Sequence, residues 1–566
     1  MRDSAAASGS GRNATYFLVF ALTAANGVWI FLDNSTPSWD QSHYMDVAWQ
    51  YQRALDRHGI YGLVHALYSV DTAHAPLYSL LVLPFLYVFG DGPRSALLLD
   101  LAITPLFLAV TGLISLELFA NRRAQQLTIV AAATMPLLVG LSHEILQDFL
   151  LLTLTTTAVW LILRSDFFRR RTTMALLGVT IGLGMLTKVT SPVFIGGPLL
   201  VAGVARIYLV LRTERGWSSV RGLMTLLIDL ATAALPALVI AAAWYGPNWG
   251  ATLAYIRSTT SGALAAGAGP ADPLTVRAIA SFTIGMLDWN LSLAIALILL
   301  IAALCCAPRA VATLRERGRS GRNVFVASFL VSWFALPYLS VALSHNQDVR
   351  LMASALPAVA VAVGGAITAI PWQAVRMVLG TLLVCAGIFQ TAVASSALST
   401  RAPVDLTLQT AVGALVLPVL GEPLGYEDEP MPDYGTPIVR TIAQESQGRS
   451  GLLCLLESDP IVNPNTLLYL VNENNLPLTV TQLFGATGQE SSLARQLKRC
   501  SFALYVRQPG LGNDAAARIS IVNSNVAADY MTPALVGLFK GPPHTFSVGG
   551  DQQVQLLTMS GGSLTR

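Results

Sequence analysis

The stretch TYFLVFALTAANGVWIFLD (residues 15–33), followed shortly by WDQSHY (residues 39–44), decides the architecture predicted for this chain. The first stretch is close to the ~20 consecutive apolar residues that a helix needs to cross a bilayer. The second places a carboxylate, Asp40, and an imidazole, His43, just beyond the end of that helix. These residues therefore predict a membrane-spanning helix with ionisable side chains at the membrane surface.

The composition of the whole chain agrees with this first segment. Hydrophobic residues make up 53% of the 566 residues, charged residues only 12%, and the mean hydropathy is +0.56. Soluble domains carry roughly 25% charged residues, so the chain is predicted to be an α-helical, multi-pass membrane protein. A net charge of +3 is too small to indicate a nucleic-acid partner.

Apolar runs of similar length recur along the chain and predict about eleven transmembrane helices. They cover residues 15–33, 96–120, 125–145, 149–165, 173–190, 192–211, 222–245, 282–306, 324–344, 351–370 and 376–397. Arginine-rich stretches follow the second, fourth, sixth and eighth runs, at residues 122–123, 169–171, 212–221 and 309–322. Because basic residues in short loops mark the cytoplasmic side, we expect a cytoplasmic N-terminus and an external C-terminus.

Residues 34–95 then form a long first external loop, which is expected to contain juxtamembrane helices. Its segment at 76–90 is apolar but short, and counting it as a span would place Arg122 and Arg123 outside. We therefore predict an interfacial or re-entrant helix there.

The composition changes after about residue 398, which divides the chain into a transmembrane domain (1–397) and an external domain (398–566). Strand-like patterns at 452–456, 478–482 and 502–507 alternate with helix-like patterns at 465–475 and 490–499. This alternation predicts a small soluble α/β domain. Cys454 and Cys500 lie in it, and the sequence leaves open whether they form a disulfide or remain two buried thiols.

Three clusters of ionisable residues fall on the side predicted to be external. Besides the segment at Asp40, they are residues 143–148 (HEILQD) and residues 345–350 (HNQDVR). Lys188, one of only three lysines, lies at the predicted outer end of the fifth span. Charges at membrane depth are costly and mark functional sites, although a lysine at the membrane edge also serves as an interfacial anchor. The convergence of these clusters on one face predicts an active site.

The order of these motifs resembles the GT-C membrane glycosyltransferases, in particular the branch of protein O-mannosyltransferases and lipid A aminoarabinose transferases. The resemblance covers about residues 15–397. Its motifs are the acidic segment 40–44, the segment 75–78 (APLY), Asp148, the segment 186–188 (LTK) and the segment 350–357. Two positions depart from the family: Gln41 stands where many relatives have a second acid, and Ala75 stands where they have the lysine of a Lys-Pro pair.

The resemblance implies an enzyme, a hexosyl- or pentosyltransferase of the bacterial inner membrane. It would transfer a sugar, with inversion, from a polyprenyl-phosphate carrier to a lipid, glycan or protein acceptor at the outer face. Two other functions remain open: a glycan ligase or polymerase that uses a polyprenyl-pyrophosphate carrier, and a lipid or sugar transporter or flippase. Many transporters have internal repeats with helices broken at matching positions, a pattern that this sequence lacks.

The residue types suit glycosyl transfer, which needs a base for the acceptor proton and cations for the leaving phosphate. Asp40 is the candidate base, and we expect partial desolvation to raise its basicity. Its alternative role is to cap the helix that begins near Gln41. Lys188 and Arg350 are the candidates that hold the phosphate, with His345 assisting.

Asp148 is the second candidate catalytic residue, preferred over Glu144. It is expected to orient the acceptor or, with Asp40, to bind a divalent cation such as Mg²⁺ or Mn²⁺, the one cofactor that the sequence leaves open. The remaining candidate substrate-binding residues are His43, Tyr44, Tyr78 and Glu144. The segment 244–249 (WYGPNW) is predicted to be an external loop whose aromatic rings suit stacking on a sugar.

Overall fold

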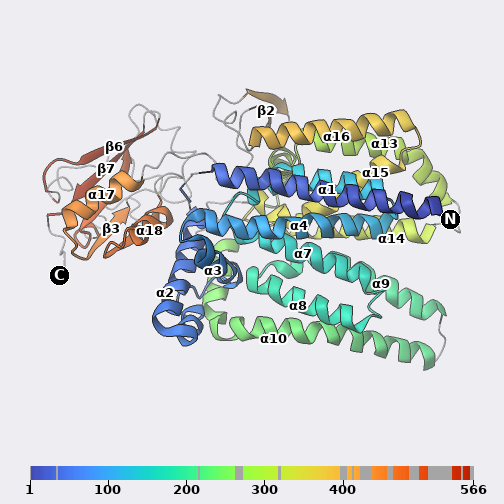
Figure 1. Ribbon diagram of the computed structural model, residues 1–566, viewed down its shortest axis with the longest axis horizontal. Helices are drawn as coiled ribbons and strands as arrows, with labels where there is room; N and C mark the ends of the chain where they lie inside the picture. The colour runs from blue at the N-terminus through green and yellow to red at the C-terminus, as the bar shows by residue number, and fades with distance from the viewer. Residues whose placement is uncertain are drawn as a thin grey trace.

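The computed structural model shows a bundle of long helices with a small sheet-containing domain at one end (Figure 1). The residues that the structure describes are 2–33, 36–37, 39–213, 217–261, 270, 272–315, 320–394, 404–410, 413–420, 435–455, 463–483, 496–507, 538, 540–549 and 552–560. The predicted fold class, a multi-pass α-helical membrane protein with a C-terminal α/β domain, is confirmed.

The bundle contains α1 and the helices between residues 93 and 394. They are α1 (Arg2–Leu32), α4 (Pro93–Phe119), α5 (Arg122–Thr134), α6 (Pro136–Leu141), α7 (Gln147–Arg164), α8 (Arg171–Thr187), α9 (Ser191–Thr213), α10 (Trp217–Ser261), α12 (Val276–Gly285), η1 (Met286–Leu291), α13 (Leu293–Arg315), α14 (Ser320–Ala342), η2 (Val349–Ala355), α15 (Leu356–Ala369) and α16 (Gln373–Ala394). Most side chains of α7 are buried. Its threonines Thr153, Thr155 and Thr157 donate their hydroxyls to the carbonyls four residues earlier, so these polar groups are satisfied within the helix.

Seven of the described helices are long and apolar enough to cross a membrane, and an eighth span results if the bent pair Val276–Leu291 and Leu293–Pro308 counts as one. Each of the eleven predicted runs overlaps one or more helices, but some of these helices are broken or short, and residues 395–397 of the last run lie outside the described residues. The run at 125–145 divides at Met135, which turns extended before Pro136 because a residue that precedes proline avoids helical geometry. α8 has only 17 residues. Eleven crossings therefore require such short or broken helices to span as well.

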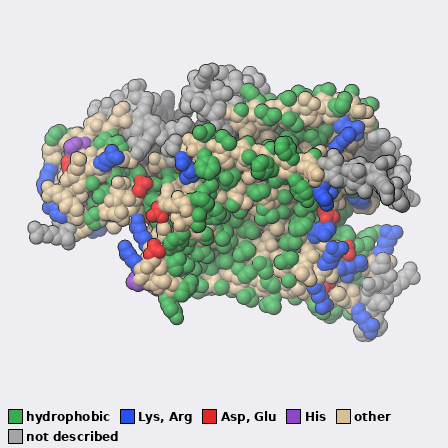
Figure 2. Space-filling view, viewed as in Figure 1, with side chains coloured by type: hydrophobic (Ala, Val, Ile, Leu, Met, Phe, Trp, Pro, Cys, Tyr) green, Lys and Arg blue, Asp and Glu red, His purple; other side chains and the backbone are tan. Residues whose placement is uncertain are grey.

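The charged side chains distinguish the two ends of the bundle. Lys and Arg gather at the end that holds the N-terminus, and an apolar belt covers the helices between the ends (Figure 2). The C-terminal domain lies beyond the opposite end (Figure 1). The predicted orientation places the basic loops in the cytoplasm. In that orientation, the end of the bundle that holds the N-terminus is the cytoplasmic end.

One prediction in α10 is wrong. Residues 244–249, predicted to be an external loop, are helical, because α10 continues through Pro247. Proline has no N–H, so the carbonyl four residues earlier, that of Ala243, loses its helical partner. The hydroxyl of Tyr68 donates to this carbonyl instead, at 2.9 Å. A neighbouring side chain thus replaces the missing bond, and Trp244 is buried and not available to stack on a sugar.

α2 (Trp39–Leu67) and α3 (Leu77–Phe89) lie at the end of the bundle opposite the N-terminus (Figure 1). α2 runs across the direction of the bundle helices. It bends at Gly59, whose φ of 60° is readily adopted by glycine. α3 has only 13 residues and is too short to span a bilayer, in keeping with the interfacial helix predicted at 76–90.

The C-terminal domain contains a five-stranded sheet in the order β4-β3-β5-β7-β6. Its elements are α17 (Gly435–Ser446), β3 (Gly451–Leu455), α18 (Pro464–Glu473), β4 (Leu478–Gln482), β5 (Phe502–Arg507), β6 (His544–Gly549) and β7 (Gln552–Thr558). β4, β3 and β5 are parallel, whereas β7 and β6 join antiparallel. The three predicted strands and the first predicted helix are confirmed, with ends that differ by at most two residues. The predicted helix at 490–499 lies largely outside the described residues.

Cys454 and Cys500 form a disulfide, which decides between the two alternatives that the sequence left open. The bond ties Cys454 near the end of β3 to Cys500, which stands two residues before the start of β5. Between the bundle and this domain the chain forms a separate antiparallel hairpin of β1 (Val404–Thr410) and β2 (Gly413–Leu420).

The C-terminal domain contacts α2 through α18. The ring of Trp49 stacks on Tyr469, with 4.8 Å between the ring centroids. Asn472 donates its amide to the Asp46 carboxylate at 2.6 Å, and its carbonyl accepts from the guanidinium of Arg53 at 3.1 Å. Because α2 also carries Asp40, the domain braces the helix that positions the candidate base.

Candidate active site

Asp40 lies in the first turn of α2, where its carboxylate meets Arg350 from a distant part of the chain. The guanidinium Nη2 donates to Oδ2 of Asp40 at 3.1 Å. Arg350 lies in η2. Its backbone N–H donates to Oδ1 of Asp348 at 2.8 Å, and its Nε lies 3.6 Å from Oδ2 of the same carboxylate. The arginine side chain is 12% exposed, whereas that of Asp40 is 46% exposed. A largely buried cation thus holds an acid whose side chain is only partly exposed.

The pKa of Asp40 departs from the expectation drawn from burial alone. Burial does raise this pKa, but the charge and hydrogen bond of Arg350, with the charges of His43 and His74, outweigh it. The net pKa lies below the ordinary value of 3.8. The expected rise in basicity is therefore wrong for this arrangement, because the sequence could not show which cation lies beside the acid.

Asp148 and Lys188 form a second ion pair. Nζ of Lys188 donates to Oδ1 of Asp148 at 2.8 Å, and the two side chains are only 18% and 6% exposed. Asp148 lies in the first turn of α7, where a carboxylate faces the positive end of the helix dipole. Lys188 directly follows α8 with an extended backbone. The ammonium group of Lys188 therefore binds a carboxylate of the protein. A lysine that serves as an interfacial anchor would instead extend toward the lipid headgroups.

Two observations connect these pairs. Gln41 accepts the backbone amide of Ile145 at 3.1 Å, which joins the start of α2 to the segment before α7. Tyr44, one helical turn after Asp40, is affected by both acids: burial first, and then the negative charges of Asp40 and Asp148, raise its pKa well above 10. Gln41 thus links the start of α2 to the segment that precedes α7.

Three predicted site residues have contacts or positions outside the ion pairs. Tyr78 is buried and donates its hydroxyl to Asp100 at 3.1 Å. Glu144 is fully buried between α6 and α7. Nδ1 of His345 lies 3.4 Å from the carbonyl of Pro270. The structure thus gives these three residues surroundings that the sequence pattern did not indicate.

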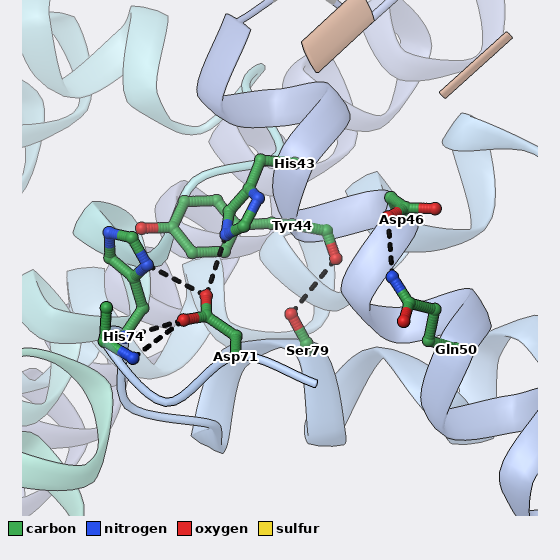
Figure 3. Close-up of polar contacts among 8 residues, drawn as sticks. His43, Tyr44, Asp46, Gln50, Asp71, His74 and Ser79 are labelled. Atoms are coloured by element: carbon green, nitrogen blue, oxygen red, sulfur yellow. Dashed lines mark hydrogen bonds and ion pairs between the residues drawn. The ribbon is translucent and has the colours of Figure 1, made fainter. Parts of the chain in front are cut away.

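His43 meets two residues that the sequence analysis did not assign to the site. Nε2 of His43 and Nδ1 of His74 each lie 2.8 Å from the same oxygen, Oδ2 of Asp71 (Figure 3). The other carboxylate oxygen of Asp71 accepts the backbone amides of Ala73 and His74, both at 3.0 Å. The three-residue spacing of Asp71 and His74, just before Pro76, is the sequence signal that could have revealed them.

Known proteins resemble this chain in part of its sequence and in its fold. Residues 73–244 match the family model of the dolichyl-phosphate-mannose-protein mannosyltransferases. No sequence among the curated proteins matches the chain. Among solved structures, ArnT from Cupriavidus metallidurans in the apo state is similar with a TM-score of 0.55 and 15% identity, over 97% of this chain and 99% of that chain.

Two further structures extend the likeness. ArnT bound to undecaprenyl phosphate gives a TM-score of 0.54 and 14% identity, over 96% of this chain and 99% of that chain. The archaeal oligosaccharyltransferase AglB from Archaeoglobus fulgidus, in complex with an inhibitory peptide and a dolichol-phosphate, gives 0.51 and 12%, over 87% of this chain and 69% of that chain. The predicted resemblance is confirmed at the level of the fold: the chain has the fold of ArnT and AglB, and residues 73–244 match the family model of the dolichyl-phosphate-mannose-protein mannosyltransferases.

Proposed function

We propose that this chain is a membrane glycosyltransferase that moves a sugar, with inversion, from a polyprenyl-phosphate carrier to an acceptor at the outer face of the membrane. The observation that carries the proposal is the presence of two ion pairs, Asp40–Arg350 and Asp148–Lys188, that are linked through α2. Each contains a cation that suits a phosphate oxygen. The similar structures with bound undecaprenyl phosphate and dolichol-phosphate support this choice of donor.

Donor binding would activate the base through an exchange of partners. A phosphodiester that binds Arg350 and Lys188 competes with the two carboxylates for these cations. Once Arg350 turns to the phosphate, Asp40 keeps the burial that raises its pKa and loses the main charge that lowers it. The carboxylate is then free, and more basic, when the acceptor hydroxyl arrives.

The proposed transfer is a single displacement. The acceptor oxygen forms a bond to the anomeric carbon while the bond from that carbon to the phosphate oxygen breaks, and Asp40 takes the hydroxyl proton. The phosphate leaves with the electron pair of the broken bond, and Arg350 and Lys188 stabilise its charge. Attack from the face opposite the phosphate inverts the anomeric configuration. Asp148 holds Lys188 in position and orients the acceptor.

A glycan ligase or polymerase that uses a polyprenyl-pyrophosphate carrier is the second candidate. The similarity to AglB, an oligosaccharyltransferase, favours it. It needs the same cations, since a pyrophosphate also leaves as an anion. A transporter or flippase, in contrast, would move its lipid without breaking the bond between sugar and phosphate.

A donor panel tests these functions. The protein, purified in detergent, is incubated with sugars labelled on polyprenyl-phosphate and polyprenyl-pyrophosphate carriers. We expect release of polyprenyl phosphate from the monophosphate donors, at least by slow transfer of the sugar to water. Turnover restricted to pyrophosphate donors would identify a ligase or polymerase. Intact donors that nevertheless move between the leaflets of proteoliposomes would identify a flippase.

We also propose that the protein resides in the bacterial inner membrane with its C-terminal domain outside. Thr545 of β6 and Thr172 of α8 are exposed and lie in the two regions predicted to face opposite sides. In a variant without the three free cysteines, Thr545→Cys is expected to react with a membrane-impermeant maleimide in intact cells, and Thr172→Cys only after lysis. The reverse pattern would overturn the orientation.

The pH dependence of transfer should report on Arg350. Arg350→Gln removes the largest effect that lowers the pKa of Asp40 and leaves the effect of burial, so the pKa rises. A base with a raised pKa becomes protonated at higher pH, so the acid limb of the kcat/KM profile for the donor, which reports the free enzyme with its Asp40–Arg350 pair, should shift upward. Arg350→Lys keeps the charge and is the control. An unshifted limb in Arg350→Gln would mean that Asp40 is not the titrating base.

A further inference from the structure

We propose that His43, Asp71 and His74 form a Zn²⁺-binding site beside the two ion pairs. The site joins α2, which carries His43, to the loop that precedes α3, which carries Asp71 and His74. The proposal goes beyond the proposed sugar transfer and does not depend on it, because metal binding is measured directly.

The distances between the possible ligand atoms suit this ion. A tetrahedral Zn²⁺ with bonds of about 2.0–2.2 Å holds its ligand atoms roughly 3.3 Å apart. Each imidazole nitrogen lies 2.8 Å from Oδ2 of Asp71, and all three ligand atoms lie within 4.8 Å of one another. Both rings point at the same carboxylate oxygen (Figure 3). Small side-chain movements away from direct contact would therefore admit the ion between them.

The carboxylate is held in place by the backbone. Oδ1 of Asp71 accepts two amides, those of Ala73 and His74, so Oδ2 is directed toward the imidazoles. Contacts of this kind orient metal ligands in known sites. The side chain of Asp71 is 9% exposed, while His43 and His74 are 30% and 22% exposed. The cluster is thus ordered by the protein and still reachable from solvent.

The ligand types select among metals. Two imidazoles and one carboxylate favour Zn²⁺ over Mg²⁺ or Ca²⁺, which prefer oxygen ligands throughout. Three protein ligands leave a fourth position for water or for an oxygen of a bound molecule. The ring of Tyr44 lies edge-on to His43 and His74, at centroid distances of 5.5 and 6.2 Å. Tyr44 stands one helical turn after Asp40, so the site lies close to the candidate base.

This position differs from the cation site that the sequence left open. Asp40 and Asp148 each contact a basic side chain, Arg350 and Lys188, which a metal ion would have to displace. Within the part of the chain that the structure describes, the ion-pair partners of Asp71 are the two histidines, and neutral histidines are metal ligands. We therefore place a divalent cation at the histidine cluster.

Zinc titration of the full-length protein tests the site. The protein is purified without a histidine tag, treated with a chelator and titrated with ZnCl₂ by calorimetry, with the bound metal counted by mass spectrometry. We expect one tightly bound Zn²⁺ per chain. His74→Ala should weaken binding by about 100-fold or more, because the loss of an outer contact alone costs 10–100-fold. His58→Ala, which removes an exposed histidine of α2, is the control and should bind like the wild type.

A second variant separates a metal site from a hydrogen-bonded cluster. Cysteine is a zinc ligand, so His74→Cys should recover most of the affinity that His74→Ala loses. Thermal denaturation in detergent shows that each variant is folded. The proposal is overturned if the folded wild type does not bind Zn²⁺ saturably, or if His74→Ala binds it as tightly as His58→Ala does.

Discussion

Asp40→Asn is expected to lower sugar transfer by about 10²–10⁴-fold at saturating donor and acceptor, the range typical of general acid–base catalysis. Asparagine has nearly the size of aspartate and keeps an oxygen that accepts the hydrogen bond now made by Arg350 at 3.1 Å. It cannot take the proton of the acceptor hydroxyl. The protein should therefore fold and insert normally, and the loss should fall on kcat in initial-rate measurements with a labelled donor.

The matched control for this variant is Asp56→Asn, which changes an exposed aspartate of the same helix. It should transfer sugar at the wild-type rate. If Asp40→Asn kept near-normal turnover, Asp40 would be a helix cap or a positioning residue, and Asp148 would become the better candidate for the base.

Lys188→Met is expected to have two large effects. It removes a cation proposed to bind the donor phosphate, and a charge-assisted hydrogen bond is worth about 1.5–3 kcal/mol, so the KM for the donor should rise by about 10–100-fold. It also leaves Asp148 buried without its cation, and breaking a buried ion pair costs about 3–5 kcal/mol of stability. Donor titrations and thermal denaturation in detergent measure the two effects separately.

A double variant distinguishes these effects. Lys188→Met with Asp148→Asn removes the uncompensated charge, so most of the lost stability should return while donor binding stays weak. Lys498→Met, at an exposed lysine of the C-terminal domain, should change neither quantity. Recovery of donor affinity in the double variant would show that Lys188 stabilises the fold and does not bind the donor.

The sequence predicted the elements of the fold well, because the signals for them are local. The length of an apolar run depends on neighbouring residues alone, and each of the eleven predicted runs overlaps a helix in the described part of the chain. The same holds for the short strands near Leu453 and Leu504. The prediction of a loop at 244–249 was wrong because Pro247 is accommodated inside a helix. The hydroxyl of Tyr68, which is distant in the sequence, donates to the Ala243 carbonyl that Pro247 leaves without a helical partner.

The candidate site shows the same limit. Asp40, Asp148, Lys188 and Arg350 could be chosen from the sequence, because charged residues at the ends of apolar runs are rare and costly there. Their pairing could not, since Asp40 and Arg350 are 310 residues apart in the chain. The direction of the Asp40 pKa shift was missed for the same reason: it depends on the nearest charge as well as on burial.

The sequence by itself determined that this chain is a membrane protein with charged clusters at the ends of its helices, because hydropathy and charge act through composition over short segments. Only the tertiary structure decided which acid meets which cation, that Cys454 and Cys500 are bonded, and that Asp71 brings His43 and His74 together. These outcomes depend on distances of a few ångströms between segments that are remote in the chain, and packing of the helices fixes those distances.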